Sequence, residues 1–182
     1  MDSGNIGFVL LCAAFVFVMT PGLAMFYGGL VRKKNVVNTM MTSIFIIGVG
    51  IVMWVLFGYS LSFAPSGNAF IGDFRWLGLE GVSLTEGYTD DASIPNMVFS
   101  AFQMMFAVIT PALITGAVAG RMKFKSIFVF TIFWSLIVYY PLAHMVWGQG
   151  GLLGADGIGA LDFAGGDVVH ISSGVSALVL CI

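Results

Sequence analysis

Long stretches without charged side chains alternate with short charged segments along this chain. Asp, Glu, Lys and Arg are absent from residues 3–31, 35–72, 92–120 and 126–155. Each stretch exceeds the roughly 20 residues that a helix needs to cross about 30 Å of hydrocarbon. A fifth uncharged stretch begins at residue 168 and is shorter. We therefore predict an all-α polytopic membrane protein without a separate soluble domain, with spans at about 5–31, 37–63, 94–120, 126–147 and 168–182.

The composition supports the bilayer as the solvent of this chain. Hydrophobic residues make up 59% of the sequence and charged residues only 9%, with a mean hydropathy of +1.01. A soluble domain typically carries about 25% charged residues, which this chain does not have. The formal net charge of −2 argues against nucleic-acid binding, which needs a phosphate-neutralising surface. No basic residue precedes the first apolar segment, so we interpret it as a membrane helix and not as a cleaved signal peptide.

Basic and acidic residues separate into different connections, and this predicts the orientation. Six of the seven basic residues lie in two hinges, which follow the first and third spans: Arg32, Lys33, Lys34, Arg121, Lys123 and Lys125. Basic hinges favour the cytoplasmic side. The acids lie at the chain start or after the second and fourth spans: Asp2, Asp73, Glu80, Glu86, Asp90, Asp91, Asp156, Asp162 and Asp167. We therefore expect a multi-pass protein of the cell membrane with its N-terminus outside.

Few side chains that are costly to bury in a membrane lie within the predicted spans, and two of them are histidines. His170 lies in the first turn of the fifth span, where a histidine usually faces a cavity or a partner helix. A hydrogen-bonded structural role is the alternative. For His144, at the outer end of the fourth span, the structural role is favoured. Asp162 lies just before the fifth span, where it can cap the helix, lend negative potential to a cation site, or do both.

Aromatic residues are the other candidates for function. Phe102 and Phe106 are four residues apart and share one helix face, and Trp147 lies at the end of the fourth span. Stacked aromatic faces can hold a cation or close a pore, although most of the 17 Phe residues are expected to face lipid or to pack. Cys12 and Cys181 form no metal or disulfide framework, and the sequence predicts no metal site.

Four segments together resemble the ammonium transporter family, Amt/Mep/Rh, and within it the Amt branch. They are GLAMFYGGLVRKKNV at 22–36, FQMMFAVITPALITGAVAGRMKF at 102–124, PLAHMVWGQGGLL at 141–153 and ALDFAGGDVVHISSG at 160–174. The resemblance implies the first five-helix repeat of an eleven-helix subunit, with the fifth helix truncated. It also implies a homotrimer of the full-length subunit, without enzymatic activity or a cofactor. A PII-type signal protein is a further expected partner, at the cytoplasmic face.

The resemblance also implies a role for each candidate residue. Trp147 and Asp162 match an external site that recruits ammonium, with Phe102 on the vestibule side. Phe106 matches a pore gate, His170 matches the first of two pore histidines, and Tyr27 neighbours a water path for protons. Two positions depart from the family pattern. They are Pro111, where a non-proline residue is expected, and Gly120, where an acid is expected.

Ammonium transport also agrees with the chemistry of these residue types. Moving a small cation into a medium of low dielectric constant costs on the order of 20 kcal/mol by an idealised Born estimate, so the ion does not cross intact. Burial favours its neutral form, and ammonia can then pass through an apolar pore with histidine as a hydrogen-bond partner or proton relay. Three alternatives remain at this stage. They are an ammonium sensor, an Rh-type gas channel and a haem-binding subunit with His144 and His170 as axial ligands.

Overall fold

The computed structural model describes residues 1–65, 68–155 and 157–182, and its regular elements there are all helices joined by irregular connections. Four helical rods are long and apolar enough to cross a membrane, and a shorter apolar helix follows them. No strand occurs in the described residues, which confirms the predicted all-α membrane fold. The α-helices are α1 Ser3–Leu30, α2 Val36–Met53, α3 Tyr59–Phe63, α4 Asn96–Ile114, α5 Phe124–Trp134, α6 Tyr140–Trp147 and α7 Ser172–Cys181.

Short helical turns of other types connect several of these helices. π-Helical turns join α2 to α3 over Trp54–Gly58 and α5 to α6 over Ser135–Tyr139, and another precedes α7 over Gly166–Ile171. These turns keep the helical direction, so α2 with α3, and α5 with α6, each form one continuous rod. Single turns of 3₁₀-helix lie at Lys33–Asn35 and Leu77–Leu79.

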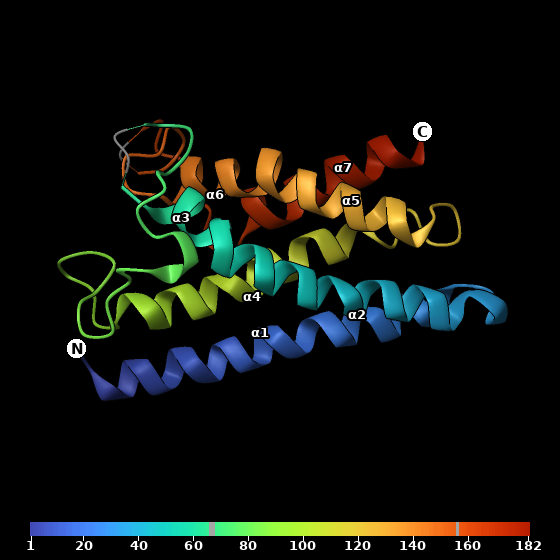
Figure 1. Ribbon diagram of the computed structural model, residues 1–182, viewed down its shortest axis with the longest axis horizontal. Coiled ribbons are helices and arrows are strands. Elements are labelled where there is room, and N and C mark those ends of the chain that lie inside the picture. The colour runs from blue at the N-terminus through green and yellow to red at the C-terminus, as the bar shows by residue number, and fades with distance from the viewer. Residues whose placement is uncertain (66–67, 156) are drawn as a thin grey trace.

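The connections gather at the two ends of the bundle (Figure 1). The two basic hinges, at 31–35 and 115–123, lie at one end, where α7 also finishes. The N-terminus and the longer connections that follow α3 and α6 lie at the opposite end. Asp156, one of the acids of these connections, lies outside the described residues. The separation of charge along the sequence thus becomes a separation between the two ends of the bundle.

The third rod ends earlier than expected, since α4 stops at Ile114 and not near residue 120. The chain tightens there, because the amide of Thr115 donates to Ala112 O (3.1 Å) and the amide of Ala117 donates to Ile114 O (3.1 Å). The Thr115 hydroxyl also donates to Ala112 O at 2.8 Å, and such local bonds compete with helix continuation. Pro111 lies inside α4, and the helix continues through it.

Gly120 lies in the turn that follows, and its backbone explains why glycine occupies it. Its φ angle is +72°, in the left-handed region that side chains with a Cβ atom adopt only at a cost. An added Cβ would also lie 3.0 Å from the Asn35 side chain. The acid expected at this position would therefore be strained in this backbone conformation.

Replacing Gly120 with alanine is expected to lower the free energy of unfolding by about 1–2 kcal/mol, because the left-handed conformation opposes a Cβ atom. Thermal unfolding of the purified protein in detergent measures this change. Gly29→Ala is the matched control, since a Cβ there meets no atom within 4 Å and α1 is regular around it. An equal or larger loss in the Gly29 variant would contradict this explanation.

Large aromatic side chains form the core near the end of the bundle that carries the long connections. Trp54, Tyr59, Phe63, Tyr139 and Tyr140 are all buried and belong to one cluster. The indole nitrogen of Trp54 donates to the carbonyl oxygen of Ser100 in α4 at 3.2 Å. This cluster fixes α3, α4 and α6 against one another, and so it positions the adjoining ends of α4 and α6.

Candidate functional site

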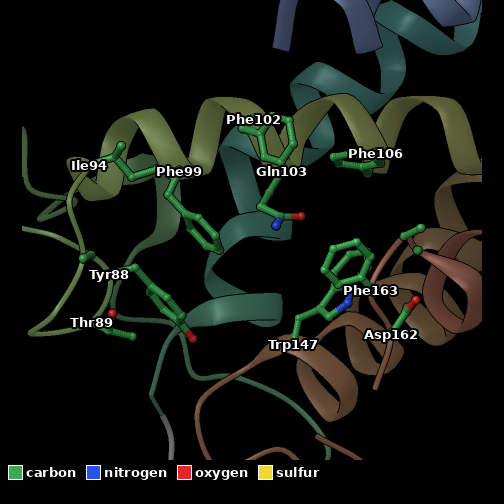
Figure 2. Close-up of a pocket in the computed structure, with 13 residues that line it drawn as sticks. Tyr88, Thr89, Ile94, Phe99, Phe102, Gln103, Phe106, Trp147, Asp162 and Phe163 are labelled. Carbon is green, nitrogen blue, oxygen red and sulfur yellow. The ribbon is translucent and has the colours of Figure 1, made fainter. Parts of the chain in front are cut away.

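A pocket of about 580 Å³ lies beside the aromatic cluster, between α4, the end of α6 and two connecting segments (Figure 2). Phe102 and Phe106 of α4 line it, and their ring centroids are 5.1 Å apart at an interplanar angle of 81°. Trp147, the last residue of α6, closes the other side, with its ring 6.4 Å from that of Phe106. The structure thus brings these three residues to one cavity.

Asp162 supplies a carboxylate to the same pocket. Its Oδ2 accepts a hydrogen bond from the amide of Val168 at 3.1 Å, at the start of the helical segment that leads into α7. Its Oδ1 is buried and has no hydrogen-bond partner among the described residues. The side chain therefore anchors the first turn through one oxygen, and its second oxygen makes no hydrogen bond with the described residues. Both interpretations of Asp162 from the sequence are compatible with this geometry.

His170 lies on the π-helical turn that starts at Gly166, and its side chain is exposed. Its Nδ1 lies 2.9 Å from the carbonyl oxygen of Gly165. A carbonyl only accepts, so Nδ1 carries the proton of this bond and Nε2 is left as the acceptor of a neutral ring. Gly165 has a φ angle of +73°, which lets its carbonyl turn toward the histidine. The local backbone therefore sets the tautomer of His170.

The structure adds lining residues that sequence reasoning missed, among them Tyr88, Phe99 and Gln103. Phe99, Phe102, Gln103 and Phe106 recur at helical spacing on α4, and this periodicity was the available signal. Tyr88 comes from the connection before α4, and its ring stacks on that of Phe99 at 4.9 Å. No sequence pattern predicts the contact between Tyr88 and Phe99.

Tyr88 forms the outer wall of the pocket as a neutral phenol. Burial raises its pKa to about 12, so its hydroxyl keeps its proton at physiological pH. The hydroxyl accepts a hydrogen bond from the amide of Gln149 at 3.0 Å, and the Gln149 side chain donates to Tyr88 O at 2.9 Å. These bonds connect the segment before α4 to the segment after α6. The wall is therefore held in place from both sides.

Tyr27 lies outside this pocket. Its hydroxyl donates to the carbonyl oxygen of Leu113 at 2.8 Å, and its ring lies against Gly116. The tightening of the chain after Ile114 gives this carbonyl a partner from α1 in place of a helical amide. The contact joins α1 to the end of α4.

His144 has a structural environment, which removes the basis of the haem alternative. The side chain is fully buried, and its Nδ1 and Nε2 lie 3.1 Å from Ser62 O and 2.8 Å from Asn68 O. Both ring nitrogens thus face backbone carbonyls, so neither is available as an axial ligand. The alternative in which His144 and His170 bind a haem iron is therefore not supported, and the favoured structural role of His144 agrees with this geometry. His144 instead joins α6 to the end of α3.

Comparison with known proteins agrees with this architecture. The family model described as Ammonium Transporter Family matches residues 7–182. The chain is 53% identical over 182 residues to an ammonium transporter of Bacillus subtilis, with 100% of this chain and 44% of that protein aligned. It is 42% identical over 201 residues to an ammonium transporter of Mycobacterium tuberculosis, again over its whole length and 42% of the relative. The chain thus spans less than half the length of these curated relatives.

Solved structures show the same fold. Mep2 of Saccharomyces cerevisiae superposes with a TM-score of 0.88 at 36% identity, over 98% of this chain and 42% of that one. Mep2 of Candida albicans gives 0.86 at 34% identity, over 98% and 38%. A structure described as a sensor Amt protein gives 0.82 at 27% identity, over 96% and 42%. From its match to the family model over most of its length, together with this shared fold, the chain belongs to the ammonium transporter family.

Proposed function

We propose that this chain forms the outer binding site and part of the conduction path of an ammonium transporter. The observation that carries the proposal is the pocket in which Phe106, Trp147 and the free Asp162 oxygen meet. Aromatic faces attract a small cation through their quadrupoles, and a nearby carboxylate adds negative potential. The pocket therefore combines the features needed to recruit ammonium from the outer solution. The similarity to relatives that are named ammonium transporters supports the same substrate.

The ion then loses its proton at this site in the proposed mechanism. Ammonium donates its proton to a water molecule at the pocket and becomes ammonia, because the apolar interior disfavours the charged form. Phe106 lies at the inner side of the pocket as the gate, and Phe102 lies on its vestibule side. Ammonia moves past the gate as a neutral molecule. Potassium has no proton to lose, and it is excluded by the cost of desolvation.

His170 serves as the polar partner of ammonia and as a proton relay in this proposal. The bond from its Nδ1 to Gly165 O orients the ring and leaves Nε2 as an acceptor for an N–H group. Its exposed side chain is accessible to a ligand, unlike the buried His144. Tyr27 is proposed to neighbour the path of the proton near the opposite end of α4.

The placement in the membrane is part of the same proposal. Both basic hinges lie at one end of the bundle, which supports a cytoplasmic position for that end and an outer position for the N-terminus. The pocket would then face the outside. α1 exposes large apolar side chains, among them Phe8 and Phe15, to lipid or to neighbouring subunits of a homotrimer. A PII-type signal protein would bind at the cytoplasmic end.

Uptake of ammonium by proteoliposomes that contain the protein at its natural length tests the function. Trp147→Leu is expected to raise the KM for ammonium by about twofold to thirtyfold, since a cation–π contact contributes about 0.5–2 kcal/mol. Trp147→Phe retains an aromatic face and is the matched control, with a smaller change expected. Absence of ammonium uptake by the unsubstituted protein would refute the proposed function. An equal KM for all three proteins would refute the role of Trp147.

An ammonium sensor is a second candidate, because the sensor Amt structure has a similar fold. The identity to that structure is 27%, against 53% to the Bacillus subtilis transporter. The same uptake assay separates the two functions, since a sensor would bind ammonium without moving it.

A further inference from the structure

Gln103 extends from α4 into the aromatic pocket, between Phe99 and Phe106 (Figure 2). Its side-chain oxygen, Oε1, is buried and accepts no hydrogen bond from the part of the chain that the structure describes. Buried polar atoms in proteins are nearly always paired, so an unpaired carbonyl oxygen that lines a cavity points to a donor supplied by a ligand. This observation is independent of the aromatic contacts that define the site.

A second oxygen, on another residue that lines the same pocket, shares this property. Asp162 Oδ1 is also buried and unpartnered, and it comes from the segment that leads into α7. Both atoms accept hydrogen bonds and donate none when Asp162 is ionised. Two free acceptors and aromatic faces in one cavity match a cation that carries several N–H groups. They do not match a cation whose surface is covered by methyl groups.

We propose that Gln103 Oε1 accepts an N–H hydrogen bond from the bound cation and thereby makes the pocket selective for ammonium over fully methylated ammonium ions. This inference deepens the proposed function and rests on it. Aromatic faces alone bind quaternary ammonium ions readily, so they do not distinguish a cation by its hydrogen-bond donors. A buried amide oxygen supplies that distinction, because a ligand without a donor leaves the oxygen unpaired.

The test compares two cations in one variant. Gln103→Leu removes the acceptor and keeps an apolar side chain of similar size. Binding of ammonium to the purified protein, measured by calorimetry, is expected to weaken roughly tenfold to a hundredfold, which is the range for hydrogen bonds to charged groups. Binding of tetramethylammonium is expected to change by less than about twofold, since it makes no hydrogen bond and the aromatic faces remain. Retained tetramethylammonium binding also shows that the variant is folded.

Two further variants make the comparison specific. Gln103→Glu keeps an acceptor at the same place, and ammonium binding at least as tight as in the unsubstituted protein is expected. Asn5→Leu removes an amide that donates to Ser93 Oγ at 2.9 Å and does not line the pocket, so no loss specific to ammonium is expected. Equal weakening of both cations in Gln103→Leu, no weakening of either, or weaker ammonium binding in Gln103→Glu would overturn the proposal.

The failure of this inference is distinguishable from failure of the proposed function. Uptake by the unsubstituted protein decides whether ammonium is transported at all. The ratio of the two binding constants in Gln103→Leu decides the role of the amide oxygen. The unsubstituted protein could transport ammonium while Gln103→Leu leaves the ratio of ammonium to tetramethylammonium binding constants unchanged. That result would support the proposed function and refute the role of Gln103.

Discussion

Replacing Asp162 with alanine is expected to reduce kcat/KM for ammonium uptake on the order of a hundredfold. The substitution removes the acceptor of the Val168 amide and the free carboxylate oxygen that lines the pocket. A hydrogen bond that involves a charged group contributes about 1.5–3 kcal/mol, and each 1.4 kcal/mol corresponds to a factor of ten. Uptake into proteoliposomes, with the amount of reconstituted protein quantified, measures the effect.

Two variants separate the roles of the Asp162 side chain. Asp162→Asn retains an oxygen that can accept from Val168 but removes the negative charge, so an intermediate loss is expected. Asp167→Ala removes a neighbouring carboxylate that does not line the pocket, and little change is expected. An Asp167 variant as impaired as Asp162→Ala would indicate a general effect of charge near α7 and would contradict the specific role of Asp162.

Replacing His144 with alanine is expected to lower the free energy of unfolding by about 4 kcal/mol. The ring is fully buried and faces Ser62 O and Asn68 O, so the substitution leaves a cavity and removes a hydrogen-bonding side chain from between two backbone carbonyls. Thermal or denaturant unfolding of the purified protein measures this loss. His144→Gln offers amide donors to the same region and is expected to lose less.

His170→Ala is the matched comparison, because the other histidine of the chain is exposed. Its unfolding is expected to change by less than about 1 kcal/mol, as is usual for surface positions, while ammonium uptake is strongly altered. The two histidines thus separate stability from function. Comparable destabilisation by the two alanine substitutions would show that burial does not distinguish them, and it would contradict the structural role of His144.

The positions of the helical rods depend on local features of the chain, so the sequence alone was sufficient to predict them. A run of about 20 apolar residues satisfies its backbone as a helix in a bilayer whatever its neighbours are. The charge-free stretches therefore predicted helices where α1, α2 with α3, α4 and α5 with α6 lie. The end of α4 was an exception. The tight turns at Thr115 and Ala117 follow that boundary, and neither residue interrupts the apolar pattern.

The site depended on contacts between segments far apart in the sequence. Helical spacing places Phe102 and Phe106 on one face, and the same spacing extends to Gln103. Trp147 and Asp162 lie beside that face because α6 and the segment before α7 pack near α4. The stacking of Tyr88 on Phe99 likewise follows from the path of an irregular connection.

Charge and hydropathy along the sequence thus determined that this is an all-α membrane chain with its basic hinges on one side. Tertiary structure decided which histidine is buried between carbonyls and which is exposed, and which acceptor oxygens lack a partner. The physical reason is that helix formation in a membrane is governed by the solvent along each segment. The hydrogen-bonding environment of one side chain is instead set by whichever distant backbone lies against it.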